Sequence, residues 1–444
     1  MGSLEILVTP NGRQSVIVVG AGPAGLTAAY RLTAHGHRIT LLSASSMPGE
    51  HFRSASDPPS PILGCHQATW TLLHSLGLQR SPSLFVESTL EFLLPDGRLA
   101  RYPKTRFPTP LQQLLTIGRF AGLSPADRWK LLSWLEQLWE GTLHLAPDLE
   151  HRTAHQWLES LGYGRASLQS VWYPLAAWLT GNDLEHLSAD AFVMALKPFF
   201  LSGSSNSRIW VPRQPWDHLL IEPIKDTLIK NGATLTVRAE AVGFEVQEDR
   251  MIGLRLKDGA ILHADWYVSA VAPPHLTPLL PERWLTRYAY FQHIADLNIL
   301  PCTIIHARTT ATLTSPRHIL LSSGPFHSVA CIPSEPDRHL KALLTIPRSR
   351  SVTDSEHVFA VLRSLNLHGA DDHFTGFSQH ETTTGLLSLS PGAKMLRPVQ
   401  QSPISNLLLV GAWTDTGWPA NLESAIVSGE RCAEIILQHQ GFRP

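Results

Sequence analysis

The sequence lacks a surplus of either charge, because 36 lysine and arginine residues balance 37 aspartate and glutamate residues. Nucleic-acid-binding proteins carry a broad positive surface, so this balance argues against a nucleic-acid partner. Charged residues make up 16% of the chain and hydrophobic residues 43%, which is typical of a globular protein and excludes a mainly disordered one. A chain of 444 residues is long for one hydrophobic core, so we expect two lobes.

Cysteine is also scarce. The four cysteines, Cys65, Cys302, Cys331 and Cys432, lie far apart and form no CxxC pair. This spacing excludes the common zinc and redox motifs, and we expect reduced, mostly buried thiols in a cytoplasmic protein. The 22 histidines show no metal-ligand spacing either, so no metal is expected.

Long apolar runs are missing. No run reaches about 18 residues, so no membrane span is expected, and Met1–Ser15 lacks the pattern of a secretory signal peptide. Attachment to the inner face of the membrane stays open, because two apolar stretches, 107–120 and 124–138, could touch lipid. The second stretch also fits a helix that faces the core, since its Trp and Leu residues recur at helical spacing.

A glycine-rich turn stands between a strand and a helix near the N-terminus. The apolar run 15–20 predicts a buried strand, residues 26–35 a helix, and 38–42 a second strand. The turn itself is Gly20, Ala21, Gly22, Pro23, Ala24 and Gly25. In this setting the first glycine permits the tight turn, the second lets a pyrophosphate approach, and the third allows helix and strand to pack. The pattern therefore predicts a dinucleotide-binding βαβ unit.

The rest of the chain predicts an α/β fold in which the C-terminus completes this unit. Strands are expected at 234–238, 241–246, 251–256, 260–263, 267–271 and 406–411, a helix at 420–436, and mainly helices from 61 to 210. We expect a discontinuous Rossmann-type domain from 13–80, 212–275 and 400–440. Residues 81–211 and 276–399 are expected to form an interleaved α+β substrate-binding domain with a helical lobe.

Several segments resemble the flavin amine oxidase and phytoene desaturase superfamily, and most closely the squalene-associated FAD-dependent desaturases, also called hydroxysqualene dehydroxylases. These segments are 63–77, 107–111, 122–127, 153–158, 172–177 and 413–425 with Ser428 and Gly429. The resemblance implies FAD as cofactor and conversion of hydroxysqualene to squalene in hopanoid or triterpene biosynthesis. It implies a long apolar isoprenoid substrate, with a membrane surface or neighbouring squalene-pathway enzymes as further partners.

The resemblance also implies where the cofactor binds. Besides the residues of the glycine turn, the implied contacts are Ser43, Arg53, Val242, Gly411, Ala412, Thr416, Gly417, Trp418, Pro419 and Ala420. No catalytic acid can be assigned. Asp415 is a candidate because it lies in the same loop, but a solvated turn aspartate is an equal interpretation. Glu423 is expected to cap a helix start and His66 to pack within a helix.

Four positions at three expected FAD contacts depart from the family pattern. Ser43 stands where an acid is expected for the ribose hydroxyls, Glu50 and His51 replace Gly and Arg near the pyrophosphate, and Ala412 replaces an acid. These changes support a second hypothesis, a paralogue with weakened or lost FAD binding that acts as a lipid-binding or partner subunit. Ser43 with Arg53 also leaves NADP open as the dinucleotide, and an amine oxidase of small polar substrates is a third possibility.

Overall fold

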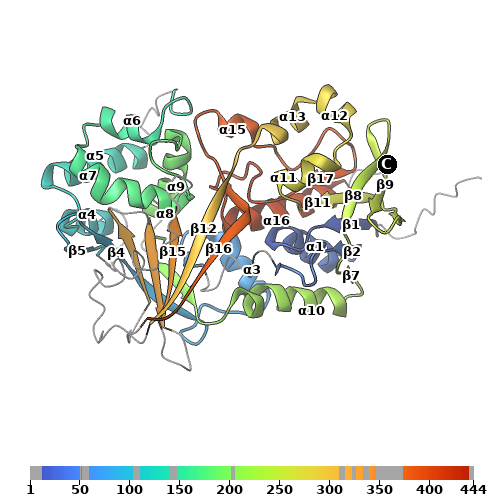
Figure 1. Cartoon of the computed structure of the whole chain (residues 1–444), viewed down its shortest axis with the longest axis horizontal. Helices are drawn as coiled ribbons and strands as arrows, with labels where there is room; N and C mark the ends of the chain where they lie inside the picture. Colours follow the sequence, from blue (N-terminus) through green and yellow to red (C-terminus); the bar gives the residue numbers. More distant parts are fainter. Residues whose placement is uncertain are drawn as a thin grey trace, which may run out of the picture.

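The computed structural model describes residues 13–50, 52, 60–103, 111–140, 148–201, 206–309, 316–322, 327–333, 340–346 and 374–439. The chain forms two lobes that lie side by side (Figure 1). One lobe is built on a five-stranded sheet with a small three-stranded sheet beside it, and the other on a nine-stranded sheet beneath a layer of helices. The two expected lobes are therefore present.

The five-stranded sheet has the order β17-β11-β1-β2-β7, and all its pairings are parallel. Its strands are β1 (Ser15–Val19), β2 (Arg38–Leu42), β7 (Thr234–Thr236), β11 (Trp266–Ser269) and β17 (Leu407–Leu409). The central strand β1 is almost wholly apolar because helices cover both faces of such a sheet. The predicted Rossmann-type core is confirmed, including its last strand from the C-terminal region.

Four helices pack around this sheet. They are α1 (Pro23–Ala34), α3 (Gln67–Ser75), α10 (Glu222–Lys230) and α16 (Leu422–Gln438). Helices α1 and α16 approach so closely that a Cβ at Gly429 would lie 2.5 Å from the backbone oxygen of Ala24. Glycine at this position therefore lets the C-terminal helix dock on the first one, as the expected C-terminal completion requires.

A small antiparallel sheet lies beside the parallel one. It consists of β8 (Ala241–Gln247), β9 (Arg250–Leu256) and β10 (Ile261–Leu262). Four short helices follow, namely α11 (Pro273–Leu276), the 3₁₀ turn Thr277–Leu279, α12 (Glu282–Arg287) and α13 (Ala289–Asp296). Trp284 of α12 stacks on Phe291 of α13, with ring centroids 5.1 Å apart, and contacts Phe244 of β8. These aromatic contacts join the helices to the small sheet.

The nine-stranded sheet is the base of the second lobe. Its strands, in spatial order, are β16 (Phe374–Leu387), β12 (Ile299–Thr309), β15 (Leu340–Ile346), β14 (Ser328–Pro333), β13 (Arg317–Leu321), β4 (Phe85–Leu93), β6 (Ile209–Pro212) and β3 (Ile62–Leu63), and β5 (Leu99–Arg101) pairs with β4. Strands β4 and β5 lie in the region expected to be mainly helical. They form a hairpin around Gly97, and Leu90 and Phe92 bury one face of β4. Apolar residues recur at helical spacing on both sides of β4 and β5, and this spacing hid the alternation of buried residues in β4, so the sequence predicted helices here.

Helices cover one face of this sheet (Figure 1). They are α4 (Leu111–Arg119), α5 (Pro125–Trp139), α6 (Ala154–Ser160), α7 (Arg165–Ser167), the π-helical turn Leu168–Trp172, α8 (Tyr173–Thr180) and α9 (Ala189–Leu201). The Ser124 hydroxyl accepts a hydrogen bond from the backbone N–H of Asp127 at 3.1 Å, so the predicted start of α5 is confirmed. On α5, Trp134 and Leu135 are buried, whereas Trp129 is 72% exposed.

The segment boundaries of the two expected domains stay a prediction. One detail differs from them. Strand β3 falls inside the expected 13–80 segment but pairs with β6, so it extends the nine-stranded sheet of the other lobe. Helix α3, which follows at once, packs against α16 on the Rossmann side. The chain thus crosses between the lobes near residue 64.

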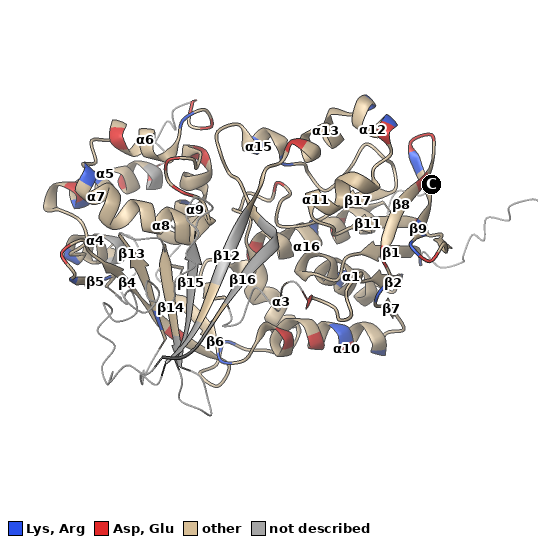
Figure 2. Ribbon diagram, viewed as in Figure 1, with Lys and Arg blue, Asp and Glu red and all other residues tan. Residues whose placement is uncertain are grey.

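The distribution of charged residues and the state of the cysteines agree with what the composition predicts. Figure 2 shows acidic and basic residues interspersed over both lobes rather than gathered by sign. Cys65, Cys331 and Cys432 are buried free thiols, while the side chain of Cys302 lies outside the described residues. Within the described parts of the chain, no helix is long and apolar enough to cross a membrane. The same residues contain no cluster of His, Cys, Asp or Glu suited to a metal ion.

Candidate cofactor site

The glycine turn joins β1 to α1 in the way the sequence predicts. Gly20 has a φ of +107°, and a Cβ there would lie 2.7 Å from the Ala270 carbonyl oxygen. A Cβ at Gly25 would lie 2.0 Å from the Gly20 carbonyl oxygen. Real Cβ atoms cannot approach a backbone oxygen so closely, so both positions require glycine. The buried alanines Ala21 and Ala24 complete the tight packing of helix on strand.

Gly22 has the opposite surroundings. No heavy atom lies within 4 Å of a Cβ built there, and Gly22 is the N-cap of α1 without a side chain to satisfy the first-turn N–H groups. Pro23 follows at the first helical position, where its missing N–H costs nothing. An open helix N-terminus of this kind binds phosphate through free N–H groups and the helix dipole. The cradle therefore fits the pyrophosphate of a dinucleotide.

The carboxyl end of β2 carries Ser43, which is buried. Its backbone N–H donates to the Thr236 carbonyl and its carbonyl accepts from the Ala239 N–H, at 2.9 and 2.8 Å. Arg238, in the left-handed region with a φ of +55°, donates its backbone N–H to the Ser45 carbonyl. The loop after β2 is thus fixed by the chain after β7. A short hydroxyl stands where a carboxylate would span both ribose hydroxyls.

The other residues named for this region are less informative. The Glu50 carboxylate accepts from the backbone N–H and the hydroxyl of Ser46, both at 3.1 Å, so its charge is directed into its own loop. Val242 lies on β8 with 41% of its surface exposed. Arg53 and His51 lie outside the described residues. The roles of Ser43, Val242 and Arg53 in cofactor binding stay predictions.

The loop Gly411–Ala420 connects β17 to α16, and two arginines hold its carbonyl groups. Arg397, just after α15 (Ala393–Leu396), donates to the carbonyls of Ala412, Trp413, Thr414 and Trp418. Arg431 of α16 donates to the carbonyls of Asp415 and Thr416, both at 3.0 Å. The loop carbonyls are therefore turned toward the protein. Neither arginine was predicted, because no spacing rule links a lone arginine to a distant loop.

Hydroxyl groups complete the support of the loop. The Gln400 side chain donates to the Thr414 hydroxyl, which lies 2.8 Å from the hydroxyl of Ser428. The Ser428 hydroxyl in turn accepts from the Gly411 N–H at 3.1 Å. Thr416 and Ser424 are joined by their hydroxyls at 2.6 Å. A loop so heavily bonded keeps one conformation, as preorganised binding needs.

The N–H groups of the loop are less occupied than its carbonyls. The backbone N–H groups of Ala412, Trp413 and Thr416 have no acceptor among the described residues. Backbone N–H groups without an acceptor attract electron-rich atoms. Gly417, with a φ of +81°, turns the loop back toward α16. The loop thus fits a group that offers hydrogen-bond acceptors, such as the carbonyls and ring nitrogens of a flavin.

Trp418 in this loop packs edge-to-face against His66, with ring centroids 5.5 Å apart and an angle of 86° between the rings. His66 precedes α3 and is 7% exposed, and its Nδ1 accepts from the Leu63 N–H at 3.3 Å. Burial lowers the pKa of His66 to about 3, so the ring is neutral and its proton is on Nε2. His66 was expected within a helix, but it lies just before α3 as its N-cap, and its ring packs against the ring of Trp418.

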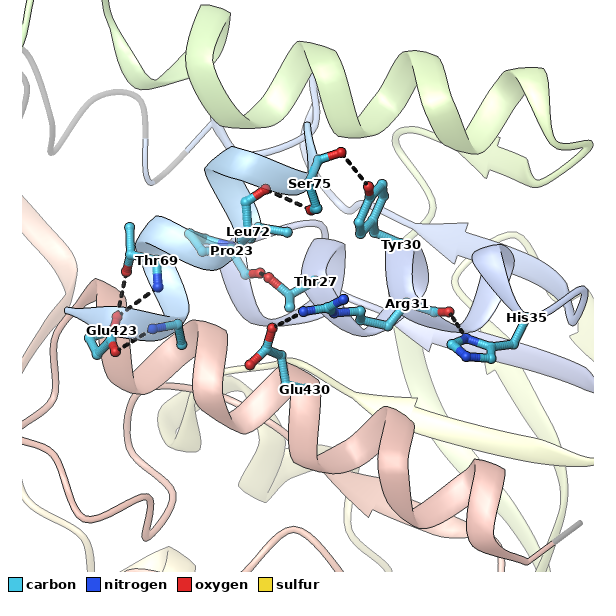
Figure 3. Close-up of polar contacts among 11 residues, drawn as sticks. Pro23, Thr27, Tyr30, Arg31, His35, Thr69, Leu72, Ser75, Glu423 and Glu430 are labelled. Carbon is cyan, nitrogen blue, oxygen red and sulfur yellow. Dashed lines mark hydrogen bonds and ion pairs between the residues drawn. The ribbon is translucent and has the colours of Figure 1, made fainter. Parts of the chain in front are cut away.

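Glu423 connects the two helix starts that meet at this place (Figure 3). Its carboxylate accepts from the backbone N–H groups of Ala68 and Thr69, at 2.8 and 2.9 Å, and from the Thr69 hydroxyl at 2.6 Å. Glu423 therefore caps a helix, as expected, but the helix is α3 rather than its own. Its own helix is capped by Asn421, which accepts from the Ser424 N–H.

Asp415 is placed as a turn residue. Its carboxylate accepts from the Gly417 N–H at 3.3 Å, and its own N–H donates to the Pro398 carbonyl. These bonds shape the loop and leave the assignment of Asp415 as a general acid a prediction. Thr416, Gly417, Trp418, Pro419 and Ala420 all lie in the same loop, at the end of the parallel sheet that also carries the glycine turn.

A parallel sheet with a glycine turn, an open helix N-terminus and a C-terminal loop at one edge defines the class of dinucleotide-binding oxidoreductases. A family model described as flavin containing amine oxidoreductase matches residues 23–437. The chain belongs to this family, and its cofactor is FAD.

Curated relatives match nearly the whole chain at low identity. The zeta-carotene desaturase of Synechocystis sp. is 24% identical over 481 residues, covering 96% of this chain and 97% of that protein. The 15-cis-phytoene desaturase of Synechococcus elongatus is 25% identical over 466 residues, covering 96% of both chains. Both are similar to this chain along their full length, so no large domain distinguishes them.

Solved structures share the fold. Wild-type putrescine oxidase bound to putrescine has a TM-score of 0.67 at 16% identity, and the match covers 96% of this chain and 99% of that one. Reduced UDP-galactopyranose mutase has a TM-score of 0.67 at 15% identity and covers 96% of each chain. At such identities the likeness concerns architecture alone, and these proteins act on chemically different substrates according to their names.

Proposed function

We propose that this protein is an FAD-dependent oxidoreductase that acts on a long isoprenoid. The observation that carries the proposal is the pairing of an open cradle at Gly22 with the fixed loop Gly411–Ala420 at one edge of the parallel sheet. When bound there, FAD supplies a two-electron exchange with a carbon of the substrate. The desaturases similar to this chain along its length support an isoprenoid rather than a small polar amine.

The finer proposal is conversion of hydroxysqualene to squalene. In that reaction the C–O bond breaks, a proton joins the leaving hydroxyl to form water, and the carbon gains a hydride equivalent, so the cofactor must first be reduced by an external donor. The residues of this chain would bind the substrate, exclude water and hold the reacting carbon against the cofactor. The large apolar core of the helical lobe, with Trp172, Phe192 and Phe199 fully buried, supports an apolar substrate lobe.

A second candidate reaction is desaturation of a carotenoid-type polyene, because the curated relatives are named for it. The two reactions run in opposite redox directions. Desaturation removes two hydrogens and needs oxidised cofactor, whereas dehydroxylation needs reduced cofactor. Incubating the FAD-loaded protein with hydroxysqualene and a reductant, and separately with phytoene and an electron acceptor, distinguishes them by mass spectrometry of the products. Squalene formation supports the first, and a product lighter by two hydrogens supports the second.

The alternative of a paralogue that does not hold FAD rests on Ser43, Glu50 and Ala412. Glu50 is directed into its own loop by Ser46, and the arginine-held loop around Ala412 is rigid without the missing acid. Both observations favour retained cofactor binding. A protein that takes up no FAD when the cofactor is added would contradict the proposed function and favour the lipid-binding alternative.

We also propose that a membrane surface supplies the substrate. Helices α4 and α5 pack together and expose Leu111, Leu114 and Trp129, and the exposed Arg119 ends α4. Aromatic and aliphatic side chains next to basic ones favour contact with an anionic lipid surface. A long isoprenoid dissolves in the bilayer, so a site at its surface would shorten the path to the enzyme.

A further inference from the structure

Arg397 is a buried cation that no carboxylate of the described residues contacts directly. It is 7% exposed, and its Nε, Nη1 and Nη2 atoms donate to the carbonyls of Trp413, Trp418, Ala412 and Thr414, at 3.2, 2.9, 3.1 and 2.6 Å. These four bonds use four of the five N–H donors of a guanidinium. Among the described residues none of its hydrogen bonds or ion pairs reaches an acid. These hydrogen bonds hold the loop Gly411–Ala420 in place, but a neutral side chain with N–H donors could do the same without a positive charge.

The charge of Arg397 is therefore only partly compensated. Burial lowers its pKa to about 10, and the nearby Asp415 opposes this change through its negative charge. The guanidinium stays positive at neutral pH. Carbonyl dipoles solvate it but add no net negative charge, so the loop carries a fixed positive field in a medium of low polarity. Such a field favours an electron-rich partner on the loop.

Arg431 offers a natural comparison. It also donates two hydrogen bonds to loop carbonyls, those of Asp415 and Thr416, yet it is exposed on α16. Solvent and salt screen an exposed charge far more than a buried one. The two arginines thus share the task of holding the loop and differ in the field that they exert within the protein.

We propose that Arg397 is the positioning residue of the loop Gly411–Ala420 and that its charge raises the midpoint potential of the bound flavin. The proposal rests on the proposed function, because it requires this loop to face the cofactor. Reduction by two electrons makes the flavin ring more negative, and a fixed positive charge nearby stabilises that form more than the oxidised one. A flavin with a higher midpoint potential accepts electrons more readily, which suits the desaturation candidate better than the dehydroxylation candidate.

Four variants separate position from charge. R397M removes the bonds and the charge, R397K keeps the charge without the planar fork, and R431M removes loop bonds but only a screened charge. D415N removes the negative charge that offsets Arg397 and retains an amide oxygen for the Gly417 N–H. The dissociation constant of FAD is measured by titrating apoprotein and following the quenching of flavin fluorescence. The midpoint potential is measured by reduction together with a reference dye.

The expected results differ in sign. R397M should weaken FAD binding by at least about tenfold and lower the midpoint potential, because several charge-assisted hydrogen bonds and the field are lost together. R397K should weaken FAD binding but leave the midpoint potential close to that of the wild type. R431M should weaken binding slightly with little change of potential. D415N should raise the potential, since the field of Arg397 is then less compensated.

Three results would overturn the inference. The first is folded R397M with the dissociation constant and potential of the wild type. The second is an equal fall of potential in R431M and R397M, because screened and buried charges would then act alike. The third result concerns the case in which circular dichroism shows that neither Arg397 variant folds. In that case, a D415N variant whose midpoint potential is unchanged or lower than that of the wild type refutes the inference. Failure of the proposed function is distinguished by a wild-type protein that takes up no flavin at all.

Discussion

Glu423 of α16 and Thr69 of α3, 354 residues apart, are joined by two hydrogen bonds, from the Thr69 N–H at 2.9 Å and from its hydroxyl at 2.6 Å. This contact ties the C-terminal helix to the helix that follows the crossing between the lobes. His66 immediately precedes α3, and Trp418, whose ring it contacts, lies in the loop that leads into α16. The geometry beside the cofactor loop thus depends on a carboxylate that need not touch the cofactor.

Replacing Glu423 with alanine should destabilise the protein. Two backbone N–H groups and one hydroxyl would lose their acceptor inside the protein, which costs about 2–4 kcal/mol in the free energy of unfolding. Urea denaturation followed by circular dichroism measures the loss. Glu430 is the matched control, because it lies on the same helix and pairs with Arg31 at a partly exposed site. E430A should cost about 1 kcal/mol or less, and equal losses in the two variants would contradict the capping role.

Acid should destabilise the protein through His66. The unfolded histidine has an ordinary pKa near 6.5, whereas burial lowers the folded pKa to about 3. Between these values the unfolded chain binds more protons, so stability is fully present above pH 6.5 and falls as the pH drops toward 3. The shift corresponds to roughly 5 kcal/mol at most, at about 1.36 kcal/mol per pKa unit. H66Q should flatten part of the pH profile of unfolding.

A second buried histidine provides the comparison. Burial lowers the pKa of His318 to about 4, so it contributes in the same direction over a narrower range. H318Q should therefore remove a smaller part of the acid dependence than H66Q. A pH profile that neither variant changes would show that the acid sensitivity has another origin.

Gly22 should be needed for the cofactor but not for the fold. A Cβ at this position meets no heavy atom of the described residues within 4 Å, so G22A should fold with nearly wild-type stability. The added methyl group would stand where the pyrophosphate approaches the backbone, and the dissociation constant of FAD should rise by about tenfold or more. Gly164, the N-cap of α7 with equally open surroundings, is the control. Equal FAD affinity in G22A and G164A would refute the cradle.

Trp129 should govern attachment to lipid. W129E places a charge where a large apolar side chain is 72% exposed, and binding to vesicles that contain anionic lipid should fall by about tenfold. Co-sedimentation with the vesicles measures the effect. I252E alters an exposed apolar residue on β9, far from α5 in the chain, and should bind as the wild type does. Similar losses in both variants would argue against a surface formed by α4 and α5.

The predictable parts of the fold are those governed by local rules. The strand, turn and helix at 15–34 combine apolar runs with Gly20 and Gly25, which the close backbone contacts require, so the sequence predicts them. The strand at 407–409 and helix at 422–438 follow the same logic. Strand β4 was missed because its partners β6 and β13 lie more than 100 residues away in the chain, and β5 was missed with it because, among the described strands, it pairs only with β4.

The candidate site was predictable to a similar degree. Its glycines and its C-terminal loop are visible in the sequence, whereas the residues that hold the loop are not. Arg397 and Arg431 bind carbonyl groups, which every residue possesses, so no side-chain pattern marks their partners. Glu423 was identified as a helix cap, but the helix that it caps became clear only when α3 and α16 were seen together.

The most direct test of the proposed function is the visible spectrum of the FAD-loaded protein, reduced without oxygen and then mixed with hydroxysqualene. The account predicts that the spectrum of oxidised flavin returns as squalene forms, because electrons pass from the cofactor to the substrate. A protein that binds no FAD would contradict the account. A second contradicting result has two parts: the reduced flavin stays reduced with hydroxysqualene, and the oxidised flavin stays oxidised with phytoene. Neither isoprenoid would then exchange electrons with the flavin.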